Sequence, residues 1–336
     1  MNEEAFLPWY TRRPKLLFGC FLVVFCAVNA WIFYYEYQFV QREAAERTAV
    51  AVDEARPEAV SFWENDGSFT LLGDAKPGEW RARFAEHKQS FEDWVEGPRQ
   101  HPSEGRKTIY LQPIGSFEDS GLDLGKLAAF AEMYFRMPVA VRAPIDPAEL
   151  EFRRRKNPHF GQEQWLTEDL LSELYDRLPD DAYAMLGLTM TDLWPGDRWN
   201  YVFGQATFSE RVGVYSFGRY DPTSRLSHAA PYGLDRRKTM MLRAMKILTH
   251  ETGHMFGIRH CLHYECNMNG TNSLRELDEQ PLHLCPVDLR KLHAATGFDP
   301  AARYHDLAGF YERRGLHEQA RFARRRSRLG QERSSR

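Results

Sequence analysis

Three histidines and a glutamate could together bind a zinc ion and move a proton. They lie in the stretch HETGHMFGIRH, which begins at His250. On an α-helix, side chains four positions apart share a face, so His250 and His254 can direct ring nitrogens at one metal ion. Glu251 lies one position round the helix, close to a metal-associated water. Gly257 can end the helix with a tight backbone turn, and the chain can then return His260 as a third imidazole ligand.

This ligand set predicts a hydrolytic zinc site. Three protein ligands and one open position are typical of catalytic rather than structural zinc. Zinc lowers the pKa of a water from about 15.7 to around 7 and polarises a carbonyl group. Glu251 could accept that water's proton and pass it to a leaving amine, so we expect hydrolysis of peptide bonds. The alternative is a surface helix with incidental histidines, but the whole spacing fits the H-E-x-x-H-x-x-G-x-x-H metzincin pattern, which chance rarely produces.

The five cysteines fall into two groups. Two lie in an apolar segment near the N-terminus, and three surround the zinc motif: Cys261, Cys266 and Cys285. Cysteines this close to a metal motif indicate ligands more than a disulfide framework. If the domain lies outside the cytoplasm, a Cys261–Cys266 or Cys266–Cys285 disulfide is the rival interpretation, because thiols oxidise there.

The residues after His260, Cys-x4-Cys-x-Met followed by Cys285, resemble the archaemetzincin family, in which the zinc helix runs straight into such a segment. The resemblance continues upstream through IYLQPIGSF, residues 109–117, and through residues 178–220, and it covers the chain from about 105 to 325. It implies a zincin-type α+β fold, a catalytic zinc ion, and a peptide or protein substrate that pairs with an antiparallel edge strand.

The resemblance also assigns Met268 to the Met-turn, an apolar floor under the zinc ion, although a methionine near a core commonly just fills space. It implies a second, structural zinc ion on four cysteines. Here the fourth position is Asp288, and zinc accepts a carboxylate oxygen as a ligand. Asp288 would also fall at the third position of a helix capped by Cys285, where a carboxylate favours the helix dipole. His263 and His283 are alternative ligands from nearby positions.

Composition describes an ordinary globular chain. Of 336 residues, 43% are hydrophobic and 27% are charged, and the net charge of −3 gives no argument for a nucleic-acid partner. A core of normal size is therefore expected. The basic residues 327–336 are expected to form a solvated, disordered tail.

Residues 16–35 (LLFGCFLVVFCAVNAWIFYY) carry no charge. A run of about 20 such residues crosses a bilayer as an α-helix. The basic residues that precede it put residues 1–15 in the cytoplasm and the large domain on the other side, by the positive-inside rule. One alternative is a signal peptide cleaved near Ala30, which would leave the domain secreted or periplasmic. Another is a buried core helix, which the absence of a polar face disfavours.

The rest of the chain divides into residues 36–104, a polar juxtamembrane stalk with an N-terminal region, and residues 105–326, the metallopeptidase domain. In that domain we expect a mixed twisted sheet, an active-site helix over residues 239–256, and a small helical C-terminal subdomain. A nearly continuous apolar run over residues 182–191 predicts a strand buried on both faces. Two further strands follow it, and one of them is expected to line the cleft.

Two local predictions concern the region before that buried strand. Residues 146–163 are charged and are expected to form a loop. Thr167 is expected to cap the helix that follows, because a threonine side chain can accept from the first free backbone amides.

Together these features predict a membrane-anchored zinc metallopeptidase. A rival from another class is a zinc-stabilised module that binds peptides without cleaving them. Glu251 argues against the rival, because a pure binder needs no base there. Tyr215 and Tyr220 are candidate donors to the negative charge that develops during hydrolysis, with plain core packing as the alternative.

Overall fold

The computed structural model describes residues 62–197, 200–207, 210–224 and 235–329, which belong to one compact unit. The expected transmembrane segment, the expected stalk up to residue 61 and the tail from residue 330 lie outside the described residues. No helix among the described residues is long and apolar enough to cross a membrane.

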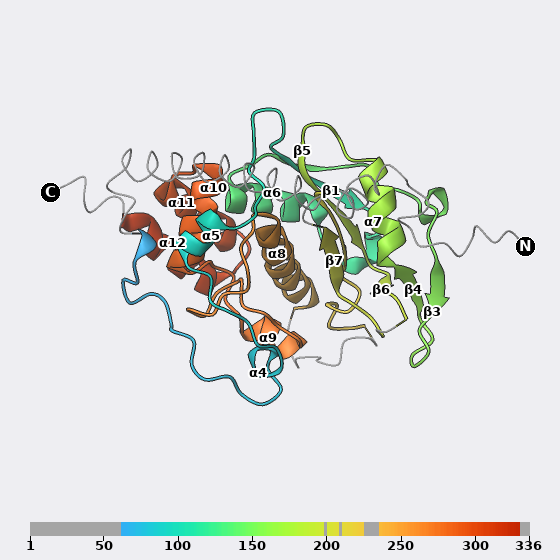
Figure 1. The fold of residues 1–336 in the computed structure, drawn as a ribbon, viewed down its shortest axis with the longest axis horizontal. Coiled ribbons are helices and arrows are strands. Elements are labelled where there is room, and N and C mark those ends of the chain that lie inside the picture. The colour runs from blue at the N-terminus through green and yellow to red at the C-terminus, as the bar shows by residue number, and fades with distance from the viewer. Residues whose placement is uncertain (1–61, 198–199, 208–209, 225–234, 330–336) are drawn as a thin grey trace, which may run out of the picture. The chain divides into compact units, whose positions relative to one another are not determined.

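A mixed five-stranded sheet forms the centre of the described fold (Figure 1). Its order is β2-β1-β5-β8-β7, in which β7 is antiparallel to β8 and the other neighbours are parallel. Every residue of β5 is buried, which confirms the prediction of a strand covered on both faces. Among the described strands β7 is a free edge, so it is the edge strand that the sequence left open. The strand bounds are Thr108–Pro113 for β1, Val139–Val141 for β2, Ala182–Thr189 for β5, Gly204–Thr207 for β7 and Val212–Ser216 for β8.

A second sheet has three strands in the order β3-β4-β6: Arg154–Lys156, Glu163–Leu166 and Asp192–Trp194. β3 lies inside residues 146–163, the region expected to be a loop, and it pairs antiparallel with β4, which begins at the last residue of that region; that part of the prediction is wrong. The sequence of these strands shows no alternation of apolar and polar residues, because many of their residues are charged or polar. Polar contacts between the strands stabilise the pair instead. Arg155 donates to Gln164 Oε1 at 2.9 Å, and its guanidinium lies over the ring of Trp194.

The predicted capping role of Thr167 is also wrong. Thr167 is the first residue of helix α7 (Thr167–Asp176), and Leu166 is the N-cap without a side-chain hydrogen bond. The Thr167 hydroxyl bonds instead to Gln205 on β7. A tertiary contact to the sheet has therefore replaced the local capping contact.

Helix α8 (Arg236–Met255) carries the first two motif histidines and runs through the middle of the described fold in Figure 1. It begins at Asp235, whose carboxylate accepts from the backbone amides of Arg237 and Lys238. The other helices are α4 Trp80–Arg83, α5 Phe91–Glu96, α6 Leu124–Phe135, α9 Leu274–Glu279, α10 Pro286–Thr296, α11 Pro300–Glu312 and α12 His317–Arg328, with short 3-10 helices at Glu118–Ser120 and Pro147–Glu149.

Buried cations on α8 hold α9 against it. Arg243 donates both to the carboxylate of Asp278 and to the backbone oxygen of Tyr220. Lys246 Nζ donates to the carbonyl oxygens of Leu277 and Asp278, at 2.7 and 2.9 Å. Burial lowers the pKa of Lys246 to about 8. These contacts hold α9 against the middle of α8.

Candidate metal centres

Helix α8 and the turn after it bring the three motif histidines together. His250 and His254 lie one helical turn apart, and their Nε2 atoms are 3.1 Å from each other. Gly257 adopts the left-handed conformation with φ 76°, and its amide donates to the His254 carbonyl at 2.8 Å. His260 then returns to the pair, so that one ligand nitrogen from each ring lies within 4.8 Å of the others. For Zn–N bonds of about 2.0–2.1 Å, tetrahedral geometry separates two nitrogens by about 3.3 Å, close to the observed pair.

The opposite nitrogen of each ring is already bonded. His250 Nδ1 contacts the carbonyl oxygen of Asn267, and His254 Nδ1 contacts that of Ile258, both at 2.7 Å. His260 Nδ1 contacts a carboxylate oxygen of Glu86, also at 2.7 Å. A carbonyl oxygen only accepts hydrogen bonds, so Nδ1 carries the proton in His250 and His254. Both Nε2 atoms are therefore unprotonated, and each has a lone pair that can bind a metal ion.

The protonation of the site also suits zinc. Burial and the neighbouring histidines lower the pKa of His250 and that of His254 to about 4, so both imidazoles are neutral near neutral pH. Zinc binds neutral imidazole. Burial raises the pKa of Glu251, while the charges of His254 and His260 lower it by a smaller amount. The donor set thus fits a zinc ion, with a carboxyl group of raised pKa beside it.

Two tyrosines on the sheet side lie near this carboxyl group. Tyr215 on β8 and Tyr220 just after it are buried, and neither hydroxyl has a hydrogen-bond partner among the described residues. Burial and the charge of Glu251 raise the pKa of each phenol. The Tyr215 side chain packs against Gly204 and Gly213: a Cβ at Gly204 would lie 2.1 Å from the ring, and one at Gly213 would lie 2.4 Å from the hydroxyl oxygen. Both hydroxyls therefore remain candidate donors at the site.

Met268 is fully buried against the helix turn that carries the motif. A Cβ at Gly253 would lie 2.6 Å from its sulfur, so the glycine leaves room for the thioether next to His254. The Met268 carbonyl accepts from the Cys261 amide at 2.7 Å, which closes the intervening loop. This is the position that a Met-turn residue would occupy.

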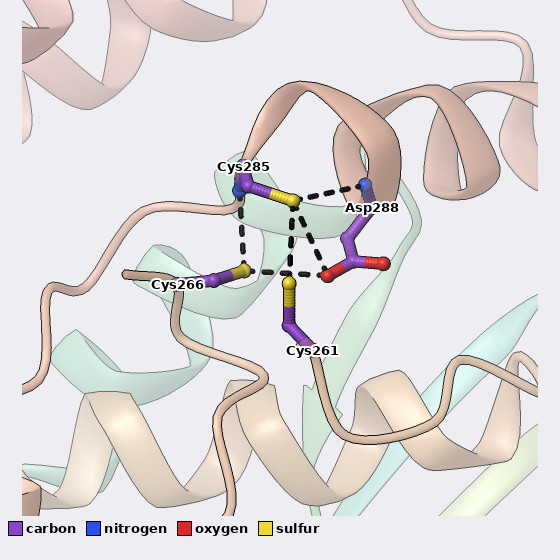
Figure 2. A group of neighbouring side chains, drawn as sticks. All are labelled: Cys261, Cys266, Cys285 and Asp288. Atoms are coloured by element: carbon purple, nitrogen blue, oxygen red, sulfur yellow. Dashed lines mark hydrogen bonds between the residues drawn. The ribbon is translucent and has the colours of Figure 1, made fainter. Parts of the chain in front are cut away.

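The three cysteines and Asp288 form a second buried group (Figure 2). Cys261 Sγ lies 3.6 Å from Cys285 Sγ, and Asp288 Oδ2 lies 3.4 Å from the sulfurs of Cys266 and Cys285. With Zn–S bonds of about 2.3 Å, tetrahedral geometry predicts separations of about 3.8 Å between sulfurs and about 3.5 Å from sulfur to oxygen. The group therefore has the dimensions of a Cys3Asp zinc site.

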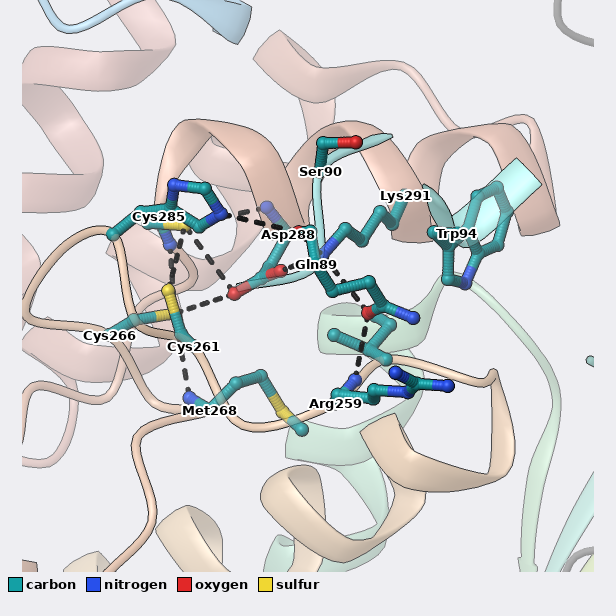
Figure 3. Close-up of polar contacts among 12 residues, drawn as sticks. Gln89, Ser90, Trp94, Arg259, Cys261, Cys266, Met268, Cys285, Asp288 and Lys291 are labelled. Carbon is teal, nitrogen blue, oxygen red and sulfur yellow. Dashed lines mark hydrogen bonds and ion pairs between the residues drawn. The ribbon is translucent and has the colours of Figure 1, made fainter. Parts of the chain in front are cut away.

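The surroundings of this group stabilise negative charge. Backbone amides of Met268 and Cys285 donate to Cys266 Sγ, at 3.5 and 3.1 Å. Lys291 Nζ lies 2.8 Å from Asp288 Oδ1, and both side chains are almost fully buried. Figure 3 shows that Lys291 also reaches Gln89, whose backbone oxygen it contacts at 2.8 Å. Because Lys291 engages Oδ1, the other oxygen of Asp288 remains free to face the sulfurs.

Helix α10 has the capping arrangement expected from the sequence. Cys285 is the N-cap, Pro286 follows it, and Cys285 Sγ accepts from the Asp288 amide. Gly297 ends the helix with φ 69°.

Burial and the nearby Cys261 sulfur raise the pKa of Asp288 to about 7, while Lys291 acts in the opposite direction.

The alternatives at this group do not match the structure. All three cysteines are free, which argues against both disulfide pairings. His263 Nε2 contacts the carbonyl oxygen of Gln89, and His283 stacks on Phe322 with ring centroids 3.7 Å apart. Neither histidine belongs to a metal-binding group of the described residues.

Sequence reasoning missed three residues: Glu86, Gln89 and Lys291. Lys291 had a detectable signal, because it lies three positions after Asp288 on the same helix and such pairs meet. Glu86 and Gln89 had none, since they are separated from the motif by more than 150 positions in the sequence. They come from residues 36–104, to which the sequence analysis assigned no part in the site.

The helix-borne histidine pair, the returning third histidine and the adjacent glutamate define the protein as a zinc metallopeptidase. A model of peptidase family M54 matches residues 161–294. The chain is 32% identical to human archaemetzincin-2 in an alignment of 309 positions that covers 79% of this chain and 85% of that protein. It is 34% identical to mouse archaemetzincin-2 in an alignment of 283 positions that covers 77% of this chain and 79% of that protein. The chain belongs to the archaemetzincin family.

A solved structure of an archaemetzincin from Methanopyrus kandleri is also similar. It is 26% identical, covers 56% of this chain and 96% of its own, and superimposes with a TM-score of 0.41.

Proposed function

We propose that this protein hydrolyses peptide bonds with a zinc ion held by His250, His254 and His260, and with Glu251 as general acid and base. One observation carries the proposal. The three Nε2 atoms converge while each Nδ1 is bonded elsewhere, and a carboxyl group lies beside them. A zinc ion bound there supplies Lewis acidity, which polarises a substrate carbonyl and acidifies water.

Glu251 handles the proton in this scheme. Its pKa is raised by burial, so it accepts a proton more readily near neutral pH than an exposed glutamate does. It then donates that proton to the amine that leaves when the peptide bond breaks. The phenol hydroxyls of Tyr215 and Tyr220 are the nearest candidates to donate to the negative oxygen of the substrate.

The free edge of β7 is proposed to bind the substrate. β7 is only half-buried and pairs on one side with β8. An extended peptide adds to such an edge through backbone hydrogen bonds, which give affinity without requiring a particular sequence.

We also propose a second, structural zinc ion on Cys261, Cys266, Cys285 and Asp288. The spacing of the four ligand atoms supports it, as do the backbone amides directed at Cys266. Lys291 supports it further, because its charge offsets part of the excess negative charge of three thiolates and a carboxylate.

Metal removal tests the proposed reaction. The purified protein is expected to cleave a peptide library, to stop when a chelator removes its zinc, and to recover when zinc is restored. Cleavage products are identified by mass spectrometry. Full zinc occupancy without any cleavage would instead favour the binding module.

We further propose that residues 16–35 anchor the protein and that the catalytic domain lies outside the cytoplasm. The charge-free apolar run and the basic residues before it support this.

A reporter enzyme that works only outside the cytoplasm, fused to the C-terminus, should be active. The double substitution Val23→Arg and Val24→Arg should remove that signal, because each central arginine costs about 2.5–3.5 kcal/mol of insertion. A silent reporter on the unmodified chain would contradict the proposal, and a mature N-terminus near Ala30 would show a cleaved signal peptide.

A further inference from the structure

Glu86 connects the N-terminal region to the third histidine. One carboxylate oxygen, Oε1, lies 2.7 Å from His260 Nδ1, and the other, Oε2, accepts from Trp80 Nε1 at 3.0 Å. The Trp80 ring packs edge-on against His260 with centroids 5.1 Å apart. Two side chains of the same segment therefore position the imidazole of His260: Glu86 through its carboxylate, and Trp80 through packing of its ring.

His260 differs in this respect from the other two histidines. His250 and His254 are held by a helix, and their Nδ1 atoms meet neutral carbonyl oxygens. His260 lies in a loop, and its Nδ1 meets a carboxylate. A carboxylate bonded to the outer nitrogen fixes the tautomer and makes the inner nitrogen a better donor to a metal. The side chains of His260 and Glu86 are only 19% and 27% exposed, so water screens this charge incompletely.

The residues from Trp80 to Trp94, here called the 80–94 segment, are attached on both sides of the histidine turn. Trp80 N donates to Glu276 Oε1 at 2.8 Å. Gln89 accepts from the Arg259 amide at 3.0 Å and donates to the Gly257 carbonyl at 3.1 Å.

The far end of the segment is attached to the end of α8. Trp94 Nε1 donates to the carbonyl oxygen of Phe256 at 2.8 Å, and the Trp94 side chain is almost fully buried. The segment thus follows the backbone turn from the end of α8 to His260.

We infer that Glu86 is a positioning residue of the catalytic zinc ion, and that the 80–94 segment is a lasting part of the metal centre rather than a prodomain that blocks it. The inference rests on the proposed function of His260. Glu86 reaches the ring at Nδ1, on the side away from the converging Nε2 atoms. A blocking segment would instead enter on the Nε2 side, and no residue of 62–104 belongs to the histidine group of the described residues.

The test uses four variants of the full-length protein: Glu86→Ala, Glu86→Gln, His260→Ala and, as a matched control, Glu104→Gln at an exposed position. Zinc affinity is measured by competition with a graded chelator, and His260→Ala identifies the zinc ion that belongs to the histidines. Glu86→Ala should weaken binding of that ion by about 10–100-fold, the usual effect of removing such a partner. Glu86→Gln should have a smaller effect, because its amide oxygen can still accept from Nδ1, although it carries no charge and its amide nitrogen cannot accept from Trp80 Nε1. Glu104→Gln should bind zinc like the wild type.

Two further measurements separate positioning from folding. The visible spectrum of the cobalt-substituted protein should change in Glu86→Ala, while the melting temperature of the metal-free protein should not. Unchanged zinc affinity in Glu86→Ala, or a loss that merely follows unfolding, would overturn the inference. So would a Glu86→Ala protein with higher peptidase activity, because that result would identify a blocking segment. If His260→Ala keeps all of the wild-type zinc, the proposed function itself fails.

Discussion

Replacing Glu251 with glutamine is expected to lower kcat/KM for peptide hydrolysis by about 10²–10⁴-fold while the zinc ion stays bound. Glutamine keeps the size of the side chain but cannot accept a proton from water. The histidine ligands keep their own partners at Asn267, Ile258 and Glu86, so the metal site should persist. The measurement is initial rates on a peptide taken from the library digest, together with elemental analysis for zinc.

The exposed Glu265 supplies a matched control, because the same substitution there lies close in sequence but outside the histidine group. Glu265→Gln should retain the wild-type rate. A Glu251→Gln rate within about threefold of wild type, with zinc in place, would remove Glu251 from the mechanism. Loss of zinc together with activity would show that Glu251 holds the metal rather than the proton.

The Cys285→Ser substitution is expected to release one of two zinc ions and to lower the melting temperature by roughly 10 °C or more. Structural zinc contributes directly to folding, and each lost kcal/mol lowers the melting temperature by about 2–4 °C in a domain of this size. Cys285 lies within 3.6 Å of Cys261 Sγ and within 3.4 Å of Asp288 Oδ2, so its sulfur is central to the group. Serine is a good N-cap residue, so the start of α10 should be preserved and the loss can be assigned to the metal.

Elemental analysis and calorimetric melting check this result. Cys20→Ser is the control, because Cys20 lies in the apolar N-terminal segment and outside the described residues. It should keep two zinc ions and the wild-type melting temperature. A wild-type protein with a single zinc ion, or a Cys285→Ser variant that keeps both, would contradict the second site.

Much of the fold was predictable where one physical signal dominated. The apolar run of β5 requires burial on both faces, and α10 carries a proline at its start and a glycine at its end. The predictions were wrong where polar contacts between strands, or contacts distant in sequence, determine the structure. The hairpin of β3 and β4 is held by polar pairing, and Thr167 bonds to β7 instead of capping its helix.

The sequence by itself identified the histidine group, because helical spacing and the turn at Gly257 confine its ligands to neighbouring positions. It also indicated the three cysteines near that motif, while Asp288 was assigned through the family resemblance. It also determined that β5 is buried and that α10 begins at Pro286. Only the tertiary structure decided which strand is the free edge, and which groups hold the outer nitrogens of the histidines. Glu86 is 174 positions from His260, and Gln89 is 202 positions from Lys291. No local pattern encodes such contacts, because they exist only once the chain has packed the N-terminal region onto the end of α8.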